Sequence, residues 1–442
     1  MRMATTPTKD IDACQWRAAT WLRAVDSRQP VVKVVPPEQE KVLRRPFYTG
    51  LSRPVPFVIC LLANKHLRFS PSNNEMADEE SFTWSETVYE LGVDLISALQ
   101  STFPNGETFF IDVSLVFDPK YVFTIYFPIL FALQWVVGIQ VLGTIIVVEW
   151  LNQILKWLMH GERPYWWVHE MEETHKADLH PHKIAEIHQY SSTCETGPGM
   201  PSGHSMAMSA AWYVIIHAIV EHVVDPSNMS AKLKMESKQL LWGIYVIIQA
   251  LVIFSRLYIA AHFPHQCFLG LFLGICMAKL AFGSTEWINF GRVRWILVSS
   301  VIMASALGTY SFLLLTGGDP SWSISEALKW CDKVENIHID TMPFYSLMRY
   351  SGAAFGLGLG LTSRFFVATD RTNFSRFQIF ANVVLGLALG YATDLAHVAI
   401  PKTNETFFYT FEFFLNIAFP YAVIALAPYV VMICGGRKEK SA

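Results

Sequence analysis

The stretch that decides the fold of this chain runs from Leu240 to His262 and reads LLWGIYVIIQALVIFSRLYIAAH. No charged residue precedes Arg256, and a run of about 20 apolar residues is long enough to cross a bilayer as a helix. Arg256 and His262 stand at its far end, where ionisable groups beside an apolar span are costly and mark functional sites. The stretch therefore predicts a transmembrane helix that carries functional residues at one end.

Apolar stretches of similar length recur along the chain. Hydrophobic residues make up 52% of the 442 residues and charged residues only 16%, which indicates lipid as the solvent of much of the chain. The mean hydropathy of +0.30 agrees with this interpretation. We predict an all-α, polytopic membrane helix bundle of about nine transmembrane helices. The expected spans lie near 121–139, 141–159, 205–223, 240–261, 266–283, 295–316, 345–362, 377–398 and 407–433.

The N-terminal part has a different character. Residues 1–82 are rich in Pro, Lys, Arg and Glu without a sustained apolar period, which predicts a polar, disordered extension ahead of a membrane domain at 83–442. A chain that began at Met76 would have only a short polar tail before this domain, so we expect residues 1–75 to be a dispensable extension or an upstream gene-model artefact. Between Thr87 and Phe103 the apolar residues follow a helical pattern, which fits either an amphipathic helix at the membrane surface or a core helix.

Basic residues fall in alternate loops and so predict the orientation. By the positive-inside rule, the basic loops and the C-terminus are cytoplasmic. The loops containing 160–204, 256–265, 317–344 and 399–406 then share the opposite, lumenal face. The basic residues concerned are Lys232, Lys234, Lys238, Arg292, Arg294, Arg364, Arg371, Arg376, Arg437, Lys438 and Lys440.

Three motifs lie on this predicted lumenal face. Lys156 is followed seven residues later by Arg163 and then by Pro164; Pro201-Ser202-Gly203-His204 opens the third span; and Ser255-Arg256 is followed by His262. Each motif alone has an ordinary explanation, such as an interfacial anchor or a helix N-cap. Together they supply cations, backbone N–H donors and two imidazoles, which phosphoryl transfer needs.

This combination resembles the signature of the type 2 phosphatidic acid phosphatase superfamily, KxxxxxxRP, PSGH and SRxxxxxHxxxD. The resemblance implies that His262 attacks phosphorus and forms a phosphohistidine, while His204 is the proton donor to the leaving oxygen. No metal and no other cofactor is required. The implied phosphate-binding residues are Lys156, Arg163, Ser202, Gly203 and Arg256.

One position departs from the superfamily signature. Where most members have Asp four residues after the nucleophile, this chain has Gln266, whose amide can accept a hydrogen bond from the imidazole but carries no charge. Glucose-6-phosphatases carry Gln at this place. The similarity to that family extends over residues 83–442, through the stretches EWLN (149–152), RPYWWV (163–168), TCETGPG (193–199), SRLYIAAHFPHQ (255–266), HIDT (338–341) and FGLGL (355–359). Glu195, which precedes the phosphate loop, is a candidate for holding an Arg in place.

The resemblance implies a phosphoric monoester hydrolase that releases glucose and phosphate from glucose 6-phosphate, or acts on a close sugar phosphate, in support of gluconeogenesis. It also implies an endoplasmic reticulum membrane location, a lumenal active site, a cytosolic C-terminus and functional coupling to a glucose-6-phosphate translocase. The ending KEKSA (438–442) fits a dilysine retrieval signal. The balanced net charge of -3 indicates no nucleic-acid partner.

Two other functions stay open: a lipid phosphate phosphatase with the same catalytic site, favoured by a pocket that opens sideways to the bilayer, and a catalytically silent transporter or scaffold.

The seven scattered cysteines contain no CxxC pair, so neither a disulfide framework nor a zinc site is expected. The His-rich loop from Met159 to Gln189 also lacks the HExxH spacing of a zinc protease.

Overall fold

The computed structural model describes residues 84–175, 184–282, 285–338, 341–370, 372–401 and 404–435. Within these ranges the regular structure is helical, which confirms the predicted all-α class, and one isolated bridge pairs Glu195 with His338. The predicted N-terminal extension, Met76, Arg371, the middle of the HIDT stretch and the dilysine ending lie outside the described residues.

The chain alternates long helices with short breaks. The elements are α3 (Trp84–Thr102), α4 (Glu107–Val116), α5 (Pro119–Tyr121), η2 (Val122–Tyr126), α6 (Phe127–Leu133), α7 (Trp135–Met159), α8 (Pro164–His175), α9 (Gly203–Ile219), η3 (Val220–Val224), α10 (Ala231–Tyr258), α11 (Pro264–Phe282), η4 (Glu286–Asn289), α12 (Arg292–Leu315), α13 (Trp322–Trp330), η5 (Val334–Asn336), α14 (Pro343–Leu361), α15 (Arg364–Asp370), α16 (Arg376–Ala399), α17 (Glu405–Tyr421), η7 (Ala422–Leu426) and α18 (Ala427–Gly435).

Eight helical stretches among the described residues are long and apolar enough to cross a membrane. They cover eight of the nine predicted spans, although the first runs from Glu107 to Leu133 and the next begins at Trp135. The predicted boundary near residue 140 was therefore wrong, because the chain breaks at Gln134, whose backbone is extended. The apolar pattern continues across this break and gives no sign of it.

The ninth predicted span, 345–362, corresponds to α14, a 19-residue helix that is not among these eight. It packs against α17, α7 and α12 and is buried along most of its length. Gly352 and Gly356, four residues apart, face the backbone of α17 so closely that a β-carbon at Gly352 would lie 2.5 Å from the carbonyl oxygen of Phe413. Small residues at this spacing let two helices approach closely in a membrane.

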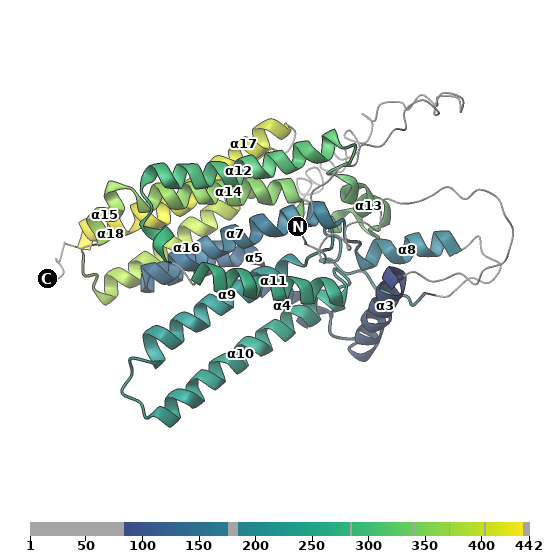
Figure 1. Ribbon diagram of the computed structural model, residues 1–442, viewed down its shortest axis with the longest axis horizontal. Coiled ribbons are helices and arrows are strands. Elements are labelled where there is room, and N and C mark those ends of the chain that lie inside the picture. The colour runs from purple at the N-terminus through teal and green to yellow at the C-terminus, as the bar shows by residue number, and fades with distance from the viewer. Residues whose placement is uncertain are drawn as a thin grey trace, which may run out of the picture. The chain divides into compact units, whose positions relative to one another are not determined.

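The loops that were predicted to share one face contact one another at one end of the bundle. In the loop 160–204, the hydroxyl of Thr193 donates to the carbonyl of Ile259 at 2.6 Å, and the carbonyl of Cys194 accepts from the N–H of His338 at 3.0 Å. Figure 1 shows α3, α8 and α13 gathered at this end, on the right of the view, with α15 and α18 at the other. The charge pattern therefore grouped the loops 160–204, 256–265 and 317–344 correctly.

Helix α3 packs one face against the loop that carries His262. Val93 and Ile96 are fully buried, whereas Leu91 and Leu95 on the other side are exposed. Gln100 donates to the carbonyls of Tyr258 and His188 and accepts from the N–H of His188. The expectation that this helix is buried in the core is therefore right for one face only. Through Gln100 the helix also connects the end of α10 to the 184–190 segment.

The expectation about disulfides was wrong. Cys194 and Cys331 form a disulfide across 137 residues, with their Cα atoms 5.9 Å apart. It joins the segment before the PSGH motif to the end of α13. Spacing rules could not find this pair, because the two cysteines lie in different loops that only the folded bundle brings together.

The disulfide is expected to stabilise this end of the molecule. Replacing Cys331 with Ser should lower the free energy of unfolding by about 2–4 kcal/mol, because the unfolded chain loses a cross-link over a long loop. Thermal unfolding in detergent tests this, with Cys434→Ser as the control because Cys434 is free and exposed. An unchanged unfolding temperature, together with no linked Cys194–Cys331 peptide in non-reducing mass spectrometry, would contradict the assignment.

Candidate active site

Two buried arginines from different motifs share one carboxylate. Arg163, at the start of α8, places Nη2 2.9 Å from Oε2 of Glu195, and Arg256, near the end of α10, is paired with Oε1 of the same residue. All three side chains are almost completely buried. Since a buried charge needs a partner, Glu195 is the counter-ion that lets both guanidinium groups stay in the interior.

The remaining donors of Arg163 bind backbone carbonyls. Its Nε donates to Gly197 at 2.6 Å and its Nη1 donates to Ala261 at 2.8 Å. Arg256 donates from Nη1 to Oγ of Ser114 on α4, 2.7 Å away, while its buried Nε has no hydrogen-bond partner among the residues that the structure describes. Each arginine is therefore fixed in orientation by neighbours from outside its own motif.

His262 lies in the turn between α10 and α11. Ala260 turns the chain there with a left-handed φ of +53°, which is strained for a residue with a β-carbon. The imidazole Nδ1 donates to the carbonyl of Gly199 at 2.8 Å. A protonated Nδ1 leaves the lone pair on Nε2, and this atom faces Nη1 of Arg163 at 3.4 Å and Oε2 of Glu195 at 3.7 Å.

Gln266 does not take over the full role of the missing aspartate. Its Oε1 lies 3.3 Å from Nδ1 of His262 and accepts from the N–H of Phe263 at 3.1 Å, while its amide donates to the carbonyl of Glu162 at 2.6 Å. The shorter contact of the imidazole is with Gly199. A backbone carbonyl thus orients His262 here, and Gln266 fixes the loop around it.

Burial and charge keep His262 neutral. Burial, followed by the positive charge of Arg163, lowers the pKa of His262 to about 3, against the opposing effect of Glu195. Burial alone would raise the pKa of Glu195, but Arg256 and Arg163 hold that pKa well below its usual range. At neutral pH the site therefore contains a carboxylate and a neutral imidazole whose Nε2 carries no proton.

The PSGH motif lies at the N-terminus of α9, which begins at Gly203. Ser202 occupies the N-cap position without a side-chain cap bond and is fully buried; its Oγ accepts from Ser205 at 3.3 Å. Asn152 of α7 donates to the carbonyl of Pro201 at 3.2 Å and lies beside Gly203. The first N–H groups of a helix placed in this way form an anion-binding end.

His204 and Lys156 border the arginine pair. His204, in the first turn of α9, is half-buried and lies within electrostatic range of Arg256, Glu195 and His262. Lys156, in the last turn of α7, is buried with Nζ beside Gly197, where an added β-carbon would be 3.5 Å away. The structure therefore brings the residues of all three motifs, with Glu195 and Gln266, into one cluster.

Sequence reasoning missed three residues of this cluster. Ser114 binds Arg256, Gly199 orients His262, and Asn152 holds the turn before α9. Gly199 and Asn152 lie in stretches that resemble the glucose-6-phosphatases, so the resemblance pointed to these stretches but not to the contacts that the two residues make. Ser114 had no signal, because it lies in a different helix 142 residues from Arg256.

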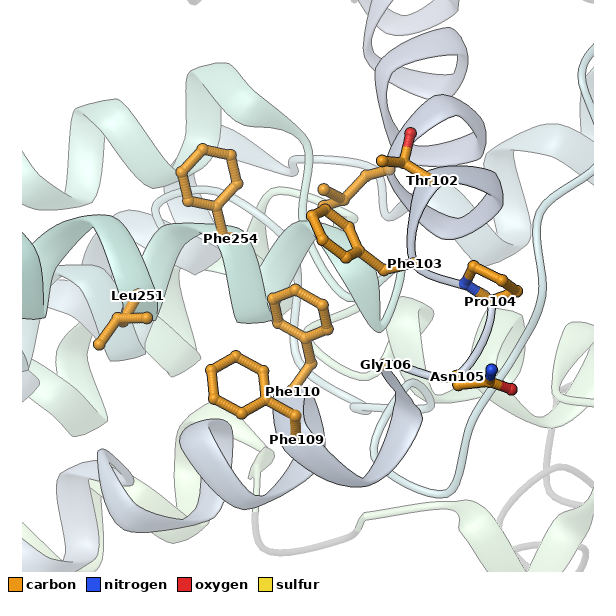
Figure 2. A pocket seen from close by; sticks show the side chains of 10 residues that line it. Thr102, Phe103, Pro104, Asn105, Gly106, Phe109, Phe110, Leu251 and Phe254 are labelled. Atoms are coloured by element: carbon orange, nitrogen blue, oxygen red, sulfur yellow. The ribbon is translucent and has the colours of Figure 1, made fainter.

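An apolar groove of about 610 Å³ lies between the end of α3, α4 and α10 (Figure 2). Phe110, which lines it, stacks on Tyr258 with ring centroids 4.3 Å apart. None of the ten described residues that line the groove belongs to the arginine cluster. The groove borders the membrane-crossing helices but does not open onto the candidate site.

Comparison with known proteins agrees with the geometry of the site. The PAP2 superfamily profile matches residues 137–290, which include all three motifs. Glucose-6-phosphatase 2 from Homo sapiens is 36% identical over 356 residues, which is 79% of this chain and 98% of that protein. The chain belongs to the glucose-6-phosphatase family.

Other members of the glucose-6-phosphatase family match to a similar extent. Glucose-6-phosphatase 3 from Homo sapiens is 36% identical over 349 residues, covering 78% of this chain and 96% of the relative. Glucose-6-phosphatase catalytic subunit 1 from Felis catus is 32% identical over 355 residues, covering 80% and 97%. No solved structure matches this chain significantly.

The carbonyl of Gly199 should be essential to the position of His262. A β-carbon at this position would collide with the carbonyl of Glu162 and lie 2.8 Å from Oε1 of Gln266, so the Gly199→Ala variant must move the loop. We expect kcat/KM for a sugar phosphate to fall by at least about 100-fold, as displacements near 1 Å do in active sites. The matched control is Gly243→Ala, because nothing lies within 4 Å of the added carbon there. Equal activity of both variants would contradict the assigned role of Gly199.

The lowered pKa of His262 predicts that stability falls with acidity. Below pH 6.5 the unfolded chain binds a proton at this residue, whereas the folded chain does so only near pH 3. Acidification from pH 7 to pH 5 should therefore cost the folded state about 2 kcal/mol from this residue alone.

Thermal unfolding in detergent at the two pH values measures this loss. The His262→Asn variant should lose that part of the pH dependence, and His222→Asn, at an exposed histidine, should keep it. An identical pH dependence in wild type and His262→Asn would show that His262 is not held neutral by the fold.

Proposed function

We propose that this chain is a glucose-6-phosphatase, which hydrolyses glucose 6-phosphate or a close sugar phosphate to the sugar and inorganic phosphate through a phosphohistidine on His262. The observation that carries the proposal is the position of Nε2 of His262, whose lone pair faces the cluster of Arg163 and Arg256. A buried neutral imidazole beside two guanidinium groups is a nucleophile aimed at an anion-binding site.

The binding of phosphate follows from the charges around His262. Arg163, Arg256 and Lys156 are buried cations on three different helices or helix ends, and they are suited to the equatorial oxygens of a phosphoryl group. Ser202 and the N–H of Gly203 add neutral donors from the start of α9. Because the single carboxylate of Glu195 is shared by two arginines and cannot balance both, the cluster favours a dianionic ligand.

The proton transfers fall to His204. It is half-buried at the start of α9, whereas His262 is fully buried, so it is the imidazole that a leaving sugar and an attacking water can reach. In the first step the Nε2–P bond forms as the bond between phosphorus and the sugar oxygen breaks, and His204 gives that oxygen a proton. In the second step His204 takes a proton from water, whose oxygen displaces His262 and releases phosphate.

The proposed location is the membrane of the endoplasmic reticulum, with the cluster facing the lumen and the C-terminus in the cytosol. The alternation of basic loops supports this orientation, and a disulfide in the segments that carry the site suits an oxidising compartment. A lumenal site depends on delivery of a charged substrate across the membrane, so we propose functional coupling to a glucose-6-phosphate translocase.

Phosphate release by microsomes that express the chain tests the function. Detergent-permeabilised microsomes should hydrolyse glucose 6-phosphate, and intact ones much less if the site faces the lumen. His262→Ala should lower kcat by more than about 1,000-fold and His204→Ala by about 100- to 10,000-fold, while His222→Ala should match wild type. A permeabilised wild type that is inert toward sugar phosphates but releases phosphate from phosphatidate would instead favour the lipid phosphatase.

A further inference from the structure

Both arginines that the proposed function assigns to phosphate are paired with a carboxylate of the protein itself. Glu195 spans them, with Oε2 at 2.9 Å from Arg163 and Oε1 paired with Arg256. Oε2 also lies 3.7 Å from Nε2 of His262. A bound phosphate would place an oxygen at a similar position. Such an oxygen accepts charge-assisted hydrogen bonds of about 2.7–2.9 Å from arginine, and the phosphorus lies about 3–3.5 Å from the nucleophilic nitrogen.

The arginines have few other donors to offer. Arg163 uses Nε and Nη1 on the carbonyls of Gly197 and Ala261, and its Nη2 lies between Glu195 and the carbonyl of Pro198, 3.4 Å away. Arg256 uses Nη1 on Ser114, which leaves Nε as its donor without a partner among the described residues. A phosphate that is to be held by both arginines beside Nε2 therefore competes with Glu195 for the same N–H groups.

We propose that the carboxylate of Glu195 is a placeholder for phosphate, which neutralises Arg163 and Arg256 before the substrate binds and is displaced from them when it does. This inference rests on the proposed function, and it changes the role of Glu195. The residue competes with the substrate for the arginines; it does not hold them in place for it.

The backbone around Glu195 confines this movement to the side chain. Cys194 is held by the disulfide to Cys331, and the Glu195 carbonyl accepts from the hydroxyl of Tyr165 at 3.0 Å. On the other side, the N–H of Thr196 donates to Thr341 at 2.9 Å. Rotation of the side chain is thus the displacement that the fold permits without moving the loop.

Charge supplies the reason for the exchange. Among the residues that the structure describes, Glu195 is the carboxylate paired with both buried guanidinium groups, and the loss of this counter-charge would be costly in the interior. A phosphate dianion brings twice the charge of the carboxylate and more acceptor oxygens, so it can replace Glu195 on the arginines. The carboxylate thereby lowers the affinity for phosphate, which also helps the product to leave.

The inhibition constant of inorganic phosphate against glucose 6-phosphate hydrolysis distinguishes a placeholder from an arginine-positioning residue. The Glu195→Gln variant keeps the shape of the side chain but removes the competing charge, so phosphate should bind about tenfold more tightly than in wild type. Glu326→Gln, the same change on α13 at a carboxylate that accepts from Trp330, should leave the constant unchanged. An unchanged or weaker affinity for phosphate in Glu195→Gln would overturn the proposal.

A structure of the wild-type chain with orthovanadate gives a second readout that needs no variant to fold. The expected result is vanadate on Arg163 and Arg256 near Nε2 of His262, with the Glu195 side chain rotated away from both. Glu195 retained on both arginines with vanadate bound beside them would overturn the displacement. If wild type hydrolyses glucose 6-phosphate but either result goes against the exchange, the placeholder fails and the phosphatase stands; an inert wild type would instead defeat the proposed function.

Discussion

The buried ion pairs of Glu195 with Arg163 and Arg256 are the constraint on which the rest of this end of the molecule depends. The two arginines come from the start of α8 and the end of α10, and neither could stay almost fully buried without a carboxylate between them. Each arginine also binds a carbonyl or hydroxyl from a third segment. One charged contact thus links segments that are far apart in the sequence, and any ligand that displaces Glu195 must supply the same counter-charge.

The surrounding structure supports this contact from two sides. The disulfide of Cys194, the bridge between Glu195 and His338 and the bond from Thr196 to Thr341 anchor the carboxylate-bearing segment to the region after α13. Helix α3 holds the ends of α10 and of the 184–190 segment through Gln100. Within this frame, the turn at Ala260 and the carbonyl of Gly199 aim the imidazole of His262 at the arginines.

Much of this arrangement could be predicted from the sequence, because spans and charged loops obey the strong physical constraints of the bilayer. The all-α bundle, eight of the nine spans and the grouping of the motif loops at one end followed from the apolar lengths and from Arg and Lys positions. The break at Gln134 did not, since the residues on both sides are equally apolar. The disulfide did not either, because Cys194 and Cys331 are 137 residues apart and only the fold brings them together.

The sequence identified the residue types of the cluster, but it did not show which of them form hydrogen bonds and ion pairs with one another. Gln266 stood where an aspartate was expected, and only the structure shows that the carbonyl of Gly199 is the closer partner of His262. The likeness to the glucose-6-phosphatases supplied candidate roles for His262 and His204, while contacts between distant segments, such as that of Ser114 with Arg256, depend on tertiary packing. Sequence patterns identify the chemistry of such a site more readily than its electrostatics.

The most direct test of the account is to trap the covalent intermediate. Purified chain mixed with glucose 6-phosphate labelled in the phosphoryl group, then quenched in alkali within one turnover and digested, should yield one labelled peptide with phosphate on His262, and the label should be lost in acid. Label on Ser202, or steady hydrolysis with no labelled histidine at any time, would contradict the claim that the imidazole facing Arg163 and Arg256 is the nucleophile.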